Sequence, residues 1–334
     1  MSSAAFQGRG TGTPAGDAAA SYIADHFKKA GLQPLGGASF FQPFPVSIES
    51  KLGTINSFSY TLAGETVACA LADEFTPLNF SGSGSLEGEV VYAGYGITAA
   101  EYGYDDYAGI DVRGKIVLIL RHEPQEFDNS SRFEGRIYTE HAQLFSKALN
   151  ARMHGARAIL YSNDSANHSG EELEKFVSLV GPADPGIPFV QVKSSVAEKW
   201  FAQAGKDFKA SQEAIDKQLQ PQSFPFGSGL HIHLSVDVVH RSKEVFNVVG
   251  YLPGSSREYI VVGAHYDHLG LGEQYSLSPE KAGQTHPGAD DTHWGPLECW
   301  PWHGNWQVSP SYGRVSCLLL LPGKKSVYWD PRIT

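Results

Sequence analysis

The chain has 334 residues, 41% hydrophobic and 19% charged, with a formal net charge of −10 at pH 7. This length accommodates two domains with a sizeable core. The negative charge argues against nucleic acid or an anionic membrane as a partner, and no apolar run approaches the length of a membrane span.

The first 45 residues predict a loop, one helix and an extended segment. Residues 6–14 are Gly-rich, but they lack the preceding strand and the Gly-Lys-Ser/Thr ending of a phosphate loop, so we expect a structural role. Periodic apolar residues predict a helix over 14–30, ended by Gly31. No signal peptide is expected, since the N-terminus has no basic patch followed by an apolar segment. The cellular location stays open.

Residues 75–229 predict a separate α/β region of alternating strands and helices. Strands are expected at 90–96, 115–120, 155–161 and 187–192, with helices at 141–154 and 194–204. The Pro-, Ser- and Gly-rich residues 221–229 indicate a linker. Further strands are predicted at 231–239 and 246–252. Cys69 is the only cysteine before residue 292, so no disulfide framework is expected.

Three polar pairs in this region could be mistaken for catalytic groups. Asp105-Asp106 lies between aromatics and glycines, which favours a turn. Glu171-Glu172 lies in a charged stretch typical of a solvated helix start. His231 and His233 alternate along a strand, which favours a partly exposed strand face over a metal site.

The stretch 258–291 carries the most specific signal. Residues 259–264 are apolar without alternation, which predicts a strand buried on both faces within a parallel sheet. His265 and Asp267 follow its carboxyl end, where functional groups of such sheets collect. Imidazole and carboxylate are good zinc ligands, and Asp267 on the same side of the chain could orient the imidazole. Asp291, on a later Gly-containing turn, could bridge two metals about 3.5–4 Å apart.

A His-x-Asp motif alone is more often an ordinary polar loop. Residues 248–254, 263–268 and 287–291 together, however, closely resemble the di-zinc aminopeptidases of metallopeptidase family twenty-eight. The resemblance implies that His265 binds one zinc, that Asp291 bridges both, and that Asp267 orients His265. Asp290 is then structural.

The resemblance also implies a fold and a domain plan. The fold class is α/β, an incomplete mixed-sheet zinc-peptidase domain of the phosphorylase/hydrolase-like type with an inserted protease-associated α/β domain. Residues 1–70 and 230–291 belong to the peptidase domain, and residues 75–229 form the insert. In the family such inserts act as lids or substrate-selecting surfaces. Many members are exported.

The resemblance stops after Asp291. The family continues Asn-Ala-Ser-Gly into an apolar helix and later supplies a Glu-Glu pair, an acidic ligand and a final histidine. Residues 292–334 instead hold five of the six tryptophans and two of the three cysteines. Read two bases into each codon, residues 292–306 can spell a segment beginning Asn-Ala-Leu-Gly, and residues 323–331 can spell Gly-Glu-Glu. We infer a frameshift after Asp291 and an out-of-frame tail.

The predicted function is therefore that of a zinc-dependent aminopeptidase acting on peptides. The general base, the first Glu of the family's pair, is absent from this chain, so we expect weak or absent zinc binding and no hydrolysis. Two alternatives stay open. The protease-associated domain could act as a non-catalytic peptide-binding module, or the chain could belong to a glutaminyl cyclase or carboxypeptidase relative. Side-chain specificity and oligomeric state are not predicted.

Overall fold

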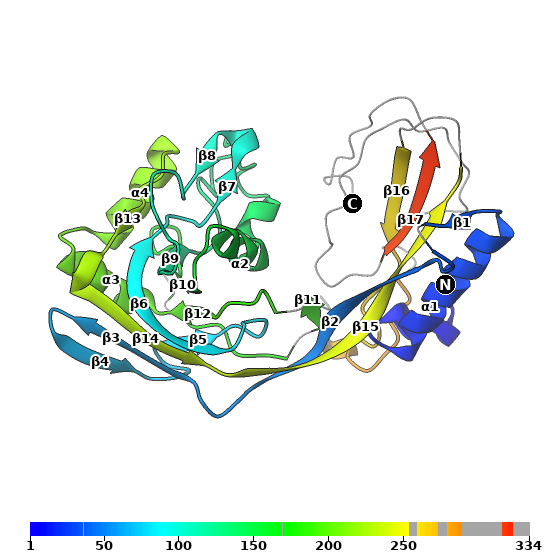
Figure 1. The fold of residues 1–334 in the computed structure, drawn as a ribbon, viewed down its shortest axis with the longest axis horizontal. Coiled ribbons are helices and arrows are strands. Elements are labelled where there is room, and N and C mark those ends of the chain that lie inside the picture. The colour runs from blue at the N-terminus through cyan, green and yellow to red at the C-terminus, as the bar shows by residue number, and fades with distance from the viewer. Residues whose placement is uncertain are drawn as a thin grey trace. The chain divides into compact units, whose positions relative to one another are not determined.

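The computed structural model describes residues 1–35, 37–168, 170, 172–178, 180–182, 184–253, 259–272, 279–288 and 316–322. The chain forms two compact units (Figure 1). Unit 1 comprises residues 1–49, 179–183 and 241–334, and unit 2 comprises residues 50–178 and 184–240. No helix among the described residues is long and apolar enough to cross a membrane.

Unit 1 is a mixed sheet with one long helix. The strands lie in the order β11-β2-β15-β17-β16, and β1 pairs with β15. Their bounds are β1 Gln33–Pro34, β2 Phe41–Leu52, β11 Gly181–Pro182, β15 Val238–Tyr251, β16 Tyr259–His265 and β17 Ser316–Pro322. The helices are α1 Pro14–Lys29 and the short 3-10 helices η1 Ala4–Arg9 and η5 Pro279–Lys281.

Helix α1 confirms the predicted helix. Thr13 accepts a hydrogen bond from the backbone N–H of Gly16, which caps the first turn. Ala19, Ile23 and Phe27 are buried one turn apart and form the unit 1 core together with apolar residues of the sheet. Tyr22 fits the same apolar periodicity but lies outside the buried face, since it is 44% exposed.

Strand β16 corrects one expectation. Among the described residues it pairs only with β17, and the pairing is antiparallel, with His265 opposite Ser316. Val262 to His265 are half-buried. The interpretation as a strand inside a parallel sheet was therefore wrong. A short apolar run without alternation does not reveal the direction of the neighbouring strand, and here that neighbour comes from the Leu-rich segment 316–322.

Unit 2 is an α/β unit around a larger mixed sheet. The strand order is β4-β3-β14-β6-β9-β10-β12-β5, with β13 paired to β6 and a separate β7-β8 pair. The strands are β3 Ser57–Leu62, β4 Glu65–Cys69, β5 Phe75–Pro77, β6 Gly84–Tyr92, β7 Thr98–Ala99, β8 Tyr104–Asp105, β9 Ile116–Leu120, β10 Ala158–Ser162, β12 Phe189–Val192, β13 Phe224–Pro225 and β14 Leu230–Val236. The helices are α2 Leu144–Met153, α3 Ser194–Gln203 and α4 Phe208–Gln218, with 3-10 helices η2 Ala100–Tyr102, η3 Glu140–Ala142 and η4 Gly227–Gly229.

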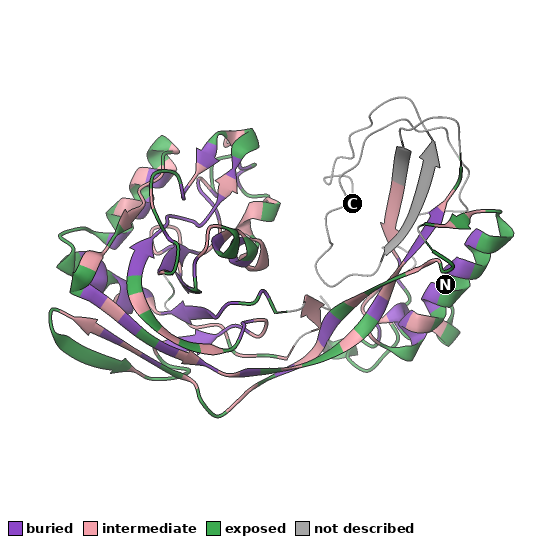
Figure 2. Cartoon of the chain, viewed as in Figure 1, coloured by how far each residue is buried: buried purple, intermediate pink, exposed green. Residues whose placement is uncertain are grey.

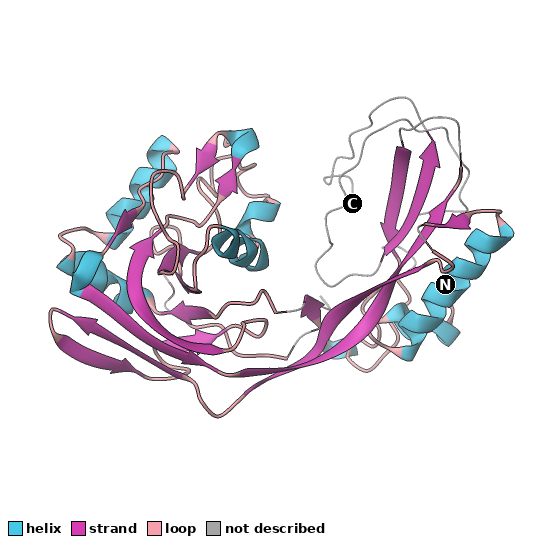
Figure 3. Cartoon of the chain, in the orientation of Figure 1, coloured by secondary structure: helices cyan, strands magenta, loops and turns pink. Residues whose placement is uncertain are grey.

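Strand β9 shows how the core of unit 2 is divided (Figure 2). All five of its residues are buried, and it runs parallel to both β6 and β10. Ile116, Leu118 and Leu120 belong to one apolar cluster, whereas Val117 and Ile119 belong to another. Since side chains alternate along a strand, the clusters lie on opposite faces of the sheet. Helix α3 covers the first face and α2 the second (Figure 3).

Helix α2 turns a different face to the core than its apolar residues predict. Met153 is 80% exposed and Leu149 lies at the surface, whereas Ala148 and Ala151 are fully buried. The small alanines let the helix approach the sheet closely. Next to Ala148 lies Lys147, a buried lysine whose ammonium donates to the backbone carbonyls of Leu120 and His122. Burial lowers the pKa of Lys147 to about 7.

Candidate metal centre

His265 lies at the end of β16, and its imidazole contacts Asp267. Its Nδ1 is 3.0 Å from the backbone carbonyl oxygen of Asp267 and 3.6 Å from the carboxylate oxygen Oδ1 of the same residue. An Nδ1–H donated to the carbonyl places the lone pair on Nε2, the nitrogen that would then ligate a metal. The backbone carbonyl of Asp267 is thus closer to the imidazole than the predicted carboxylate.

The Asp267 side chain is anchored by the N-terminal loop. Asp267 is 8% exposed, and its Oδ2 accepts a hydrogen bond of 2.7 Å from the Thr11 hydroxyl. Oδ1 is buried without a hydrogen-bond partner among the described residues. A buried carboxylate oxygen of this kind is suited to orient a neighbouring imidazole or to face a cation.

Arg9 connects the two halves of the predicted metal motif. The residue is 1% exposed. Its guanidinium donates to backbone carbonyls of Tyr266 (2.7 Å), Pro287 (2.8 Å), Met1 (3.1 Å) and Gly288 (3.3 Å). Tyr266 lies between His265 and Asp267, and Gly288 lies in the turn that leads to Asp291. The Gly-rich N-terminal loop therefore has the predicted structural role, and it sets the distance between these segments.

Gly288 is needed where the turn approaches His268. Its φ is +59°, and a Cβ built there would lie 2.5 Å from the His268 ring. Asp290 and Asp291 themselves lie outside the described residues. Of the predicted metal motif, the described residues thus provide the imidazole of His265 and its orienting group Asp267, a donor set that fits part of a zinc site and is too small for a whole one.

Two groups of at least three potential metal ligands occur in the described part of the chain, and both lie in unit 2. One consists of Glu87, His231 and His233 on the sheet surface. His233 is exposed and forms an ion pair of 3.1 Å with exposed Glu87, which confirms the predicted partly exposed strand face.

The second group was missed by the sequence analysis. It consists of His122, Glu126, Asp164 and His168. His122 follows β9 and Asp164 follows β10, two adjacent parallel strands. The rule that functional groups collect past the carboxyl ends of parallel strands would have found them had it been applied to these two predicted strands.

The Asp105-Asp106 pair has a structural role, as expected. Asp106 is fully buried and accepts hydrogen bonds from the backbone N–H groups of Tyr95 and Ile97. It also accepts one of 2.6 Å from the Tyr104 hydroxyl. Burial raises the pKa of the Asp106 carboxyl to about 7, although these hydrogen bonds oppose the rise.

Two family models match parts of the chain. Residues 86–200 match the family model of the PA domain, and residues 247–295 match that of peptidase family M28. The second match contains His265, Asp267 and Asp291. The comparison with curated proteins finds none that matches.

Three solved structures illustrate the structural comparison. The aminopeptidase from Aneurinibacillus sp. strain AM-1 is 19% identical with a TM-score of 0.36, and the match covers 78% of this chain and 45% of that one. A zinc aminopeptidase from Bacillus subtilis is 18% identical with a TM-score of 0.30, covering 79% and 44%. A peptidase M28 precursor from Shewanella amazonensis is 14% identical with a TM-score of 0.32, covering 74% and 47%. The chain thus spans less than half of the length of each.

Proposed function

We propose that the chain belongs to peptidase family M28 with an inserted protease-associated domain, and that the intact protein is a zinc-dependent aminopeptidase that removes N-terminal residues from peptides. The observation that carries the proposal is the imidazole of His265, held through Nδ1 by Asp267 at the end of β16. It lies inside the segment that matches the peptidase family.

The described residues have defined tasks in this proposal. His265 offers Nε2 to a metal, and Asp267 fixes the ring through its carbonyl. Arg9 holds the segment of His265 and the turn before Asp291 in register. A bound zinc would polarise the scissile carbonyl and lower the pKa of its water towards about 7.

We further propose that residues 1–334 alone do not support this chemistry. Two proposed ligands, His265 and Asp291, fall short of the three or four protein ligands that zinc sites use. The Glu-Glu pair that supplies the general base in the family is also missing from residues 292–334. The expected state is weak zinc binding at His265 and no turnover.

The test compares the 334-residue chain with a version in which one nucleotide is restored after the Asp291 codon. We expect the restored chain to release the chromophore of a leucine anilide in the presence of zinc. His265→Ala should lower that rate about 100-fold or more, whereas His26→Gln, at an exposed position of α1, should not change it. Robust turnover by the 334-residue chain, or by the restored chain carrying His265→Ala, would contradict the proposal.

The same experiment separates the alternative functions. A glutaminyl cyclase or a carboxypeptidase would leave the leucine anilide intact and act on peptides with an N-terminal glutamine or a free C-terminus. The peptide-binding alternative requires that unit 2 be a folded domain, which agrees with its extensive core. Such a module would bind a fluorescent peptide equally well with and without zinc, both in the 334-residue chain and in the restored chain.

A further inference from the structure

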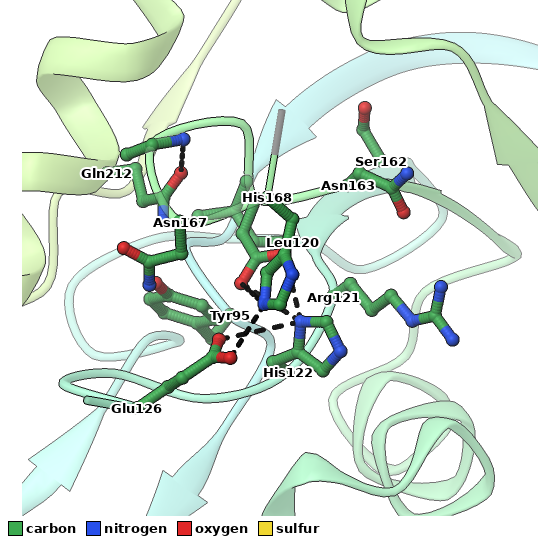
Figure 4. Close-up of polar contacts among 12 residues, drawn as sticks. Tyr95, Leu120, Arg121, His122, Glu126, Ser162, Asn163, Asn167, His168 and Gln212 are labelled. Atoms are coloured by element: carbon green, nitrogen blue, oxygen red, sulfur yellow. Dashed lines mark hydrogen bonds and ion pairs between the residues drawn. The ribbon is translucent and has the colours of Figure 1, made fainter. Parts of the chain in front are cut away.

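The four side chains missed by the sequence analysis converge from two loops of unit 2. His122 and Glu126 lie in the loop after β9, and Asp164 and His168 lie in the loop after β10. Each pair is spaced by four residues. Figure 4 shows the carboxylate of Glu126 facing the imidazoles of His122 and His168. The potential ligand atoms of all four residues lie within 4.8 Å of one another.

The spacing of these atoms suits a tetrahedral metal. His122 Nδ1 lies 2.9 Å from Asp164 Oδ1 and 3.6 Å from Glu126 Oε2. His168 Nε2 lies 2.6 Å from Glu126 Oε1 and 4.0 Å from Asp164 Oδ2. Ligands about 2.0 Å from a tetrahedral zinc are about 3.3 Å apart. The observed distances lie on both sides of this value, so small side-chain movements would bring one donor from each residue to a common centre.

The charge of the cluster favours a cation. The side chains of Glu126 and Asp164 are 2% and 0% exposed. In the described part of the chain, neither carboxylate forms an ion pair with a lysine or arginine. Glu126 Oε2 is buried without a hydrogen-bond partner there. Two buried carboxylates are costly unless they are paired or coordinate a metal, and histidines supply a full balancing charge only when both are protonated.

The neighbouring groups orient the potential ligands. The Tyr138 hydroxyl donates to Glu126 Oε1 at 2.9 Å, and the Tyr138 ring stacks on His122 at a centroid distance of 5.1 Å. Outer groups of this kind fix metal ligands in the geometry for binding.

We propose that unit 2 binds one zinc ion through His122, Glu126, Asp164 and His168, separately from the peptidase centre. Two imidazoles with two carboxylates select zinc or a similar transition metal over calcium and magnesium, which prefer oxygen ligands. The ion links the loop after β9 to the loop after β10, and it stabilises both loops of the protease-associated domain. This inference does not depend on the aminopeptidase proposal.

The test uses the full chain in a His265→Ala background, which removes the predicted peptidase ligand. Metal-free protein is titrated with Zn²⁺ by calorimetry, with Co²⁺ by visible absorption, and with Ca²⁺ as the oxygen-preferring control. Glu126→Gln and His168→Gln each remove one ligand. His233→Gln is the matched control, because it removes a histidine of the same unit and breaks up the exposed Glu87 group.

We expect one Zn²⁺ and one tetrahedral Co²⁺ site in the background protein and in His233→Gln, and no comparable Ca²⁺ binding. Glu126→Gln and His168→Gln should each raise the zinc Kd about 100-fold or more. Zinc at 100 times the Kd of His233→Gln should raise the Tm of this control by about 5–10 °C. The same zinc concentration should have no such effect on Glu126→Gln or His168→Gln.

Hydrogen exchange is compared with and without zinc within each variant, so the variants need not be equally stable. Zinc should slow exchange at residues 121–128 and 163–168 in the control and not in Glu126→Gln. This variant is expected to fold, since the introduced amide oxygen can still accept the hydrogen bond from Tyr138. Zinc affinity that is unchanged in Glu126→Gln and His168→Gln, or lost equally in His233→Gln, would overturn the proposal. Absence of zinc binding by the folded background protein would do the same, and would leave protonated His–carboxylate pairs as the explanation of the cluster.

Discussion

Replacing Arg9 by methionine tests how the N-terminal loop supports the predicted peptidase centre. Methionine keeps much of the length and apolar volume of the buried stem but removes every guanidinium donor. The carbonyls of Tyr266 and Pro287 lose their hydrogen bonds of 2.7 and 2.8 Å, and those of Met1 and Gly288 lose longer ones. Buried carbonyls without donors carry a desolvation cost.

The magnitude follows from the number and length of these bonds. A hydrogen bond from a charged donor contributes about 1.5–3 kcal/mol, so the two short ones set a scale of about 3–6 kcal/mol. Entry of water and the burial of the methionine side chain offset part of this loss. We expect Arg9→Met to lower the free energy of unfolding by about 3–5 kcal/mol. Arg9→Lys should lose about half as much, because an ammonium cannot reach carbonyls on several sides at once.

Urea unfolding measures the global effect, and hydrogen exchange at residues 265–270 and 286–288 locates it. The control is Arg113→Met, because Arg113 is fully exposed and pairs with exposed Asp111. This variant should leave both the unfolding midpoint and the exchange at these segments unchanged. A loss below about 1 kcal/mol in Arg9→Met, or unaltered exchange at both segments, would refute the assigned role of Arg9.

Three further outcomes are expected. The folded-state pKa of Asp106 is raised from 3.8 to about 7. The stabilisation by protonated Asp106 is therefore fully present below pH 3.8 and is lost as the pH rises through about 7. The free energy of unfolding falls by up to about 1.4 kcal/mol per pH unit in this range. Denaturation from pH 4 to 7 should show this decline in the native chain and not in Asp106→Asn; a parallel decline in both would exclude Asp106 as the cause. Trp200 is fully buried, and its ring lies 5.4 Å from that of Tyr60, centroid to centroid. Trp200→Ala should therefore lower the free energy of unfolding in urea by about 3–5 kcal/mol. A decrease under about 1 kcal/mol would contradict the assigned packing. Thr13→Ala removes the N-cap of α1 and should cost about 1 kcal/mol, whereas Thr13→Ser should retain most of the stability.

The elements that could be predicted are those whose local signals agree with their surroundings. Residues 14–29 combine helical periodicity with an N-cap and a terminating glycine, and the helix appears where it was expected. The apolar run at β9 likewise forms a fully buried strand. Helix α4 was missed, because its polar composition conceals the few buried positions, Phe208 and Ile215 among them.

Other features depend on partners that are distant in the sequence. The direction of β16 is determined by β17, whose residues 316–322 lie within the segment interpreted as out of frame. The buried face of α2 depends on how closely its alanines approach the sheet, not on its largest apolar residues. For the unit 2 ligand cluster, neither His122 nor Asp164 belongs to a recognisable local motif. They meet only because β9 and β10 are adjacent and parallel.

The chain enters and leaves unit 2 from neighbouring strands of unit 1. The backbone first passes from unit 1 to unit 2 after Glu49, on β2, and finally returns at Arg241, on β15, the neighbour of β2 in one sheet; residues 179–183 also belong to unit 1. An ion pair of 3.0 Å joins Glu49 and Arg241. The points of departure and return are therefore close enough for a short hairpin turn to replace residues 50–240. Apart from the two-residue edge strand β11, such a deletion leaves the unit 1 sheet uninterrupted, so a chain without residues 50–240 retains a continuous hairpin from β2 to β15.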